Sequence, residues 1–124
     1  MNDEVTKPLP LAIRTKKFAL RIIRLSDALP RRRSAEVIGR QILRSGTSVG
    51  AQYREGHRAR STAEFISKLE SSIQELSETQ YWLELLAEGG IVADRKLHEL
   101  MQEAEELMAI LVSSVITVKK KSKK

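Results

Sequence analysis

The sequence contains no cysteine, which excludes a disulfide framework, a thiolate metal site and a cysteine nucleophile. Its longest nearly apolar stretch, AILVSSVITV at residues 109–118, is far shorter than the roughly 20 residues that span a bilayer as a helix. The first residues, MNDEVTKPLP, lack the basic start and apolar run of a signal peptide. With 124 residues, the chain is long enough for a single core. We therefore expect one soluble, cytoplasmic domain with no membrane partner.

Positive and negative charges are unevenly distributed along the chain, although the net charge is only +6. Residues 1–62 hold 14 Lys and Arg against 5 Asp and Glu, a net of +9. Residues 63–118 hold 3 against 11, a net of −8, and the final KKKSKK adds five positive charges. This division predicts either an anionic partner for the first half or charge pairing between the halves, within one chain or between copies.

Apolar residues recur every three or four positions in four segments, which is the spacing of an amphipathic α-helix. Helix start signals stand at Ser34, at Ser61 or Thr62, and at Asp94, and Gly89-Gly90 ends the third segment. Short connections make successive helices antiparallel neighbours. We therefore predict an all-α, up-down-up-down four-helix bundle over residues 11–118. A disordered N-terminal arm (1–10) and a disordered basic tail (119–124) are expected to flank it.

The second segment contains a glycine- and arginine-rich stretch, RSGTSVGAQYREGHRARS, from Arg44 to Ser61. The stretch has neither the lysine and spacing of a Walker loop nor the strand and glycine order of a dinucleotide site. Gly46 and Gly50 are four residues apart, so on a helix they would lie one above the other and admit a close neighbour. We expect a continuous or slightly kinked helix, the alternative being a break near Gly46 to Gly50.

Catalytic and metal-binding patterns are missing from the sequence. His57 and His98 are each preceded three residues earlier by an arginine, so the Glu-x-x-His motif of metal-binding bundles is absent. The serines of SGTS and LESS have no neighbouring base to activate them. We expect no enzyme activity, no cofactor, and no catalytic, cofactor-binding or metal-binding residue.

Arginines on the second segment predict an exposed basic stripe. At about 100° per residue, Arg40, Arg44, Arg54 and Arg58 all point away from Ile38, which we take as the core direction. A second row of basic residues flanks the core side of the first segment. If the two rows adjoin, they form a patch suited to phosphates. The candidate nucleic-acid-binding residues are Arg14, Lys17, Arg21, Arg24, Arg40, Arg44, Arg54 and Arg58.

The alternative is that these cations form a solvated face or an ion-pair surface between subunits. Stacking aromatics are scarce, since only Tyr53, Tyr81 and Trp82 are not assigned to core positions. On the third segment, Glu64, Glu75 and Glu78 share one side with Trp82, and this acidic stripe could meet the arginine face of a neighbouring copy.

Surplus apolar surface on the third and fourth segments predicts self-association. A helix that is apolar nearly all round is buried on more than one side, and one small bundle can cover only one side. A ring of head-to-tail contacts would pair two different faces. The candidate oligomer-interface residues are Tyr81, Trp82, Leu85, Ile110, Val112 and Ile116.

Several motifs together resemble one bacterial family. They are SGTSVGA, Y-R-E-G, R-S-x-x-E-F-I and E-T-Q-Y-W-L, with G-R-Q-I-L-R upstream. Over residues 11–118 the chain resembles the four-helix bundle proteins encoded in intervening sequences of 23S rRNA genes. That family is sometimes labelled a 23S ribosomal protein and is related to the accessory variability protein of diversity-generating retroelements. The resemblance implies a homopentameric ring without known catalysis and a link to RNA or nucleoprotein partners.

Two functional classes follow from the residues and the resemblance. The first is a non-enzymatic oligomeric adaptor that binds RNA or a nucleoprotein through its basic face. The alternative is a structural protein–protein interaction module whose charged faces serve ring assembly.

Overall fold

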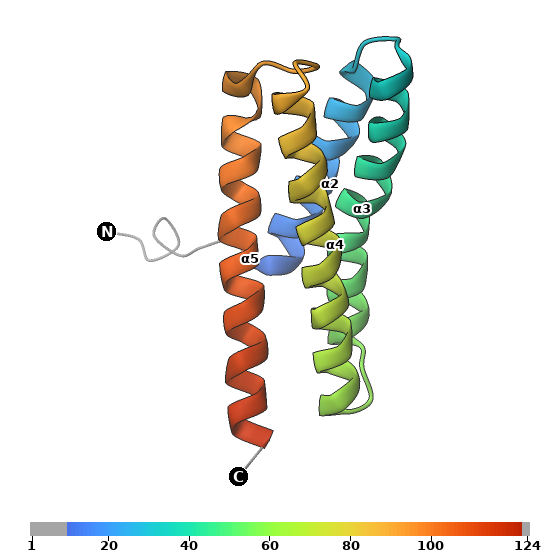
Figure 1. The fold of residues 1–124 in the computed structure, drawn as a ribbon. Coiled ribbons are helices and arrows are strands. Elements are labelled where there is room, and N and C mark those ends of the chain that lie inside the picture. The colour runs from blue at the N-terminus through green and yellow to red at the C-terminus, as the bar shows by residue number, and fades with distance from the viewer. Residues whose placement is uncertain (1–9, 123–124) are drawn as a thin grey trace, which may run out of the picture.

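The computed structural model describes residues 10–122, which fold into four α-helices and contain no strand (Figure 1). The predicted all-α four-helix bundle is thereby confirmed. Each helix packs along its sequence neighbour, and α2 also packs against α5, so the four helices close into a bundle around one core. The helices are α2 (Leu11–Ala28), α3 (Arg33–His57), α4 (Thr62–Glu88) and α5 (Asp94–Ser122).

The core consists of the apolar stripes of all four helices. Its largest members are almost completely inaccessible to solvent, so the chain buries the surface that its sequence pattern marks as apolar. The core cluster includes Phe18 and Ile22 from α2, Ile42 and Val49 from α3, Leu76, Leu83 and Leu86 from α4, and Leu97, Leu107 and Leu111 from α5.

Helix ends follow two of the four predicted signals; at a third, Asp94 is the first residue of α5 itself, so it lies inside the helix and is not the N-cap residue that we expected. The Ser61 hydroxyl accepts a hydrogen bond from the Glu64 amide at 3.1 Å and caps α4. Gly90, with φ of 70°, ends that helix in the left-handed region. The expected cap at Ser34 is wrong, because the carbonyl of Arg32 already accepts the first helical hydrogen bond from Glu36 at 3.0 Å.

Helix α3 runs unbroken through its glycines, as expected. A Cβ atom at Gly50 would stand 3.1 Å from Thr15 Oγ1 on α2, so the absence of a side chain lets the two helices approach closely. On the α4 side, the Thr79 hydroxyl donates to Ser45 Oγ at 2.8 Å in the buried interior. Small residues therefore hold α3 close to both of its neighbours.

Helix α5 is longer than the sequence indicates. It continues to Ser122, so the expected disordered tail beginning at residue 119 is corrected to helix as far as residue 122. Lysine is a good helix former, and Lys119 Nζ also binds Glu70 Oε2 of α4 at 3.1 Å. The remainder of that tail, 123–124, and residues 1–9 of the predicted arm lie outside the described residues.

Candidate nucleic-acid interface

Two of the eight candidate cations form ion pairs with glutamates of the same chain. The first is Arg14 on α2. Its guanidinium binds both carboxylate oxygens of Glu103 on α5, at 2.6 and 3.1 Å, and reaches Glu106 at 3.1 Å. The hydrogen bond to Glu103, together with the charges of both glutamates, raises the pKa of Arg14. With only 14% of its side chain exposed, Arg14 joins α2 to α5 and is not a free ligand for an external anion.

The second engaged cation is Arg44 on α3, which binds two glutamates of α4 in the same chain. Its Nη1 lies 3.2 Å from Glu75 Oε2, and its Nη2 binds Glu78. The hydrogen bond to Glu78 and the charge of Glu75 raise the pKa of Arg44. Arg44 therefore already pairs with both glutamates within one chain, and the pairing of these glutamates with a neighbouring copy stays a prediction. Antiparallel packing of α3 and α4 already brings the opposite charges together within one chain.

The other six candidates form no ion pair with any carboxylate between residues 10 and 122. All are exposed except Arg21, which is half-buried. They are Lys17, Arg21 and Arg24 on α2, Arg40 and Arg54 on α3, and Arg58 immediately after α3.

The two rows do not merge into the continuous patch that we considered. Lys17, Arg21 and Arg24 follow Arg14 at spacings of three and four, so they lie on the flank of α2 that faces α5. Between this row and the arginines of α3, the outer surface of α2 carries Leu20, which is 44% exposed. An apolar ridge thus separates two basic surfaces.

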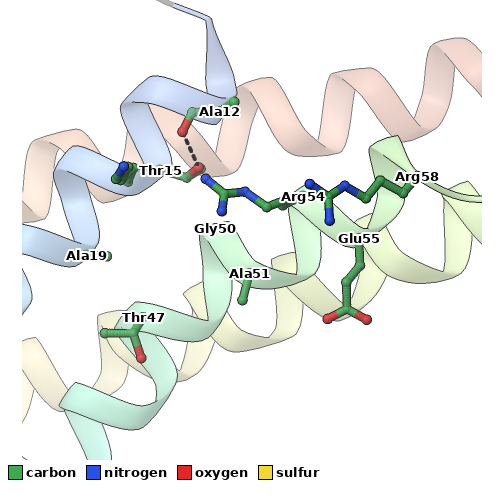
Figure 2. A pocket seen from close by; sticks show the side chains of 10 residues that line it. Ala12, Thr15, Ala19, Thr47, Gly50, Ala51, Arg54, Glu55 and Arg58 are labelled. Carbon is green, nitrogen blue, oxygen red and sulfur yellow. Dashed lines mark hydrogen bonds between the residues drawn. The ribbon is translucent and has the colours of Figure 1, made fainter.

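A groove of about 330 Å³ lies between α2 and α3, next to the second basic surface (Figure 2). Arg54, Arg58 and Lys16 line it, and the figure shows both arginine side chains extending in the same direction along α3. The sequence analysis missed Lys16, which lies among several basic residues on α2. Its spacing was the available signal: Lys16 stands four residues after Ala12 and three before Ala19, and residues at such spacings share one side of a helix.

The aromatic residues do not line this groove. Tyr53 packs against the core cluster, and its hydroxyl shares a hydrogen bond of 2.6 Å with His57 Nε2. Burial raises the pKa of Tyr53. Tyr81 is 54% exposed, but it lies on α4, and Trp82 beside it packs against the core. The surface between α2 and α3 therefore offers charge and hydrogen-bond donors without stacking rings.

The six predicted interface residues do not form one patch. Tyr81, Val112 and Ile116 are exposed, whereas Trp82, Leu85 and Ile110 are half-buried. At about 1.5 Å rise per residue, Tyr81 lies about 10 Å from the connection between α4 and α5, and Ile116 about 33 Å from it. The exposed members of this predicted set therefore lie in two separate regions, near opposite ends of the bundle.

Two properties of the described residues bear on other functions. Residues 10–122 contain no group of three or more His, Cys, Asp or Glu side chains placed to hold a metal ion. Within the same range, no helix combines the length and the apolar character needed to cross a membrane.

Comparison with known proteins places this bundle in a family. A family model described as 23S rRNA-intervening sequence protein matches residues 9–113. A crystal structure from Bacteroides thetaiotaomicron is similar at 36% sequence identity and a TM-score of 0.81. The likeness covers 86% of this chain and 98% of that one, which is described as a protein of unknown function from the S23 ribosomal protein family. No curated protein matches, and the relation to retroelement proteins remains a prediction. The chain therefore belongs to the 23S rRNA-intervening sequence protein family.

Proposed function

We propose that this chain is a non-enzymatic, self-associating bundle that binds RNA through the cations of α2 and α3. The observation that carries the proposal is that most of the candidate cations have no carboxylate partner to neutralise their positive charge. Six of the eight candidate cations have no carboxylate partner among residues 10–122, whereas Arg14 and Arg44 each have two. Clustered positive charge of this kind is neutralised well by phosphates, whose counterions are released on binding.

The arrangement favours contact with the RNA backbone over recognition of bases. Guanidinium groups form bidentate hydrogen bonds with phosphate oxygens, and neither basic row includes an exposed aromatic ring on which a base could stack. Two rows separated by an apolar ridge would follow two stretches of backbone. The expected binding is therefore sensitive to salt and tolerant of sequence.

Titration of a fluorescent single-stranded RNA at several salt concentrations tests the proposal. If all six free cations contact phosphates, the logarithm of the binding constant should fall with the logarithm of salt at a slope of about −4. That slope corresponds to a loss of roughly 300-fold between about 50 and 200 mM salt. Absence of RNA binding at the lowest salt concentration would contradict the proposal.

A second candidate function is assembly, and the exposed apolar surface of α4 and α5 favours it. Tyr81 and Ile116 are 54% and 49% exposed. A neighbouring copy could cover these two side chains. The resemblance suggests five copies. Sedimentation measures this directly, and a monomer at micromolar concentration would exclude it.

A further inference from the structure

We infer that the groove between α2 and α3 is a binding site for one phosphate group. Three cations line it, namely Lys16, Arg54 and Arg58, and none of them pairs with a carboxylate in the described part of the chain. The one acidic residue at the groove, Glu55, is engaged elsewhere. Its Oε1 accepts a hydrogen bond from Lys68 Nζ at 3.0 Å, and Figure 2 shows its carboxylate turned away from the two arginines.

Small side chains leave the space that an anion needs. Ala12 and Ala19 of α2 face Gly50 and Ala51 of α3 across the groove, and the free volume is about 330 Å³. This volume is at the lower end of the range for ligand pockets, so it suits a small group. The close approach of Gly50 to Thr15 fixes the separation of the two walls.

The hydrogen-bond donors of the groove come from its cations. The Thr15 hydroxyl donates to the carbonyl of Leu11 at 2.7 Å, and the Thr47 hydroxyl donates to the carbonyl of Leu43 at 2.7 Å. Each arginine fork carries five N–H donors, and the lysine adds three. So many donors match the several oxygens of a phosphate better than the two of a single carboxylate.

The start of α2 adds to the positive potential. This helix begins at Leu11, its N-cap residue Pro10 makes no side-chain cap, and its first turn contains no acidic residue. The amide end of a helix carries partial positive charge, and no acidic residue stands in the first turn of α2 to offset it. Ala12, in that first turn, lines the groove.

This inference rests on the proposed RNA function only for the source of the phosphate, which could be an RNA backbone or a free phosphate. The experiment therefore uses the full chain with two probes: a single-stranded RNA without terminal phosphates, and inorganic pyrophosphate. The R54Q and R58Q variants remove groove charge, and A51L fills the groove without changing charge. The R95Q variant removes one exposed charge on α5 and serves as the matched control.

We expect each groove variant to weaken RNA binding about tenfold, whereas R95Q should change it by less than about twofold. Pyrophosphate should shift the amide resonances of Ala12 and Gly50 in the parent protein but not in A51L. Such shifts without any RNA binding would support the phosphate-binding site and assign it to free phosphate. The same result would contradict the proposed RNA-binding function.

Two results would contradict the inferred phosphate-binding site. The first is an A51L variant that binds both probes like the parent, since diffuse charge attraction does not depend on free volume in the groove. The second is RNA binding that R54Q, R58Q and R95Q reduce equally. In either case, if the protein still binds RNA, the proposed function stands, because cations outside the groove would then make the contacts with RNA. Circular dichroism of each variant confirms that the helices are retained.

Discussion

Gly46 of α3 lies against Ile22 of α2 so closely that a Cβ atom at position 46 would stand 2.8 Å from both Cγ1 and Cγ2 of Ile22. Ile22 is completely buried, so it has little room to move away. A glycine in a helix costs about 1 kcal/mol relative to alanine, and the close packing of α2 on α3 offsets that cost. This contact holds α2 close to α3, one helical turn from Gly50, which lines the groove between the two helices.

The G46L substitution should therefore lower the free energy of unfolding by about 1 to 3 kcal/mol, because the core beneath it is overpacked. Chemical denaturation measures the change. A51L, an added leucine at an exposed position of the same helix, should change stability by less than about 0.5 kcal/mol. Equal stability of the two variants would show that the observed contact between Gly46 and Ile22 is not energetically important.

The Arg14–Glu103 pair should contribute to the attachment of α2 to α5. Only 14% and 21% of the two side chains are exposed, so the bidentate pair is shielded from solvent more than an ordinary surface pair. A double-mutant cycle with R14Q and E103Q should give a coupling energy of about 1 kcal/mol. A coupling energy indistinguishable from zero would refute a stabilising role for this pair.

Charge reversal at Arg44 distinguishes pairing within one chain from pairing between copies. R44E places a third negative charge beside Glu75 and Glu78, and we expect a loss of about 0.5 to 1 kcal/mol in stability. Adding E75K and E78K in the same chain should restore it, measured by thermal unfolding.

The matching control mixes R44E chains with chains that carry only E75K and E78K. If the mixture assembles and regains stability while the combined variant does not, the pairing operates between copies, in contradiction to the contact within the chain. Sedimentation of the mixture provides the measurement.

Exposed apolar residues on α4 and α5 should support self-association in two separate regions. Y81D and I116D each introduce a charge at a side chain about half exposed, so neither should destabilise an isolated bundle by more than about 0.5 kcal/mol. If copies contact through these regions, both should reduce the sedimenting mass at micromolar concentration. V37D, at a 46% exposed apolar site on α3, is the matched control. Equal masses for all variants would exclude these regions as the interface.

The fold was predictable from the sequence because its apolar residues follow the helical period almost without interruption. The stripe that includes Ile38, Ile42 and Val49 indicated α3 despite its glycines, and Ile42 and Val49 are completely buried. The end of α5 was not predictable in the same way. Lysines favour a helix and also a solvated tail, and the contact of Lys119 with Glu70 depends on tertiary packing.

The candidate site was predictable only in part. Periodicity places Arg40 and Arg54 on an exposed face, and both are exposed. It cannot show that Arg44 meets Glu75, because that contact depends on the register between two antiparallel helices. For the same reason, the sequence does not show which cations of α2 lie on the side of α5 and which line the groove on the side of α3.

The central claim is that the free cations of α2 and α3, and not net charge alone, bind RNA. The most direct measurement compares the salt dependence of RNA binding for two triple variants of equal net charge. One carries R40Q, R54Q and R58Q, and the other carries R95Q, K96Q and K120Q, all at exposed positions of α5. The account predicts that the first variant loses about 2 from the slope while the second keeps the parent slope. Equal loss in both variants, or no loss in either, would contradict it.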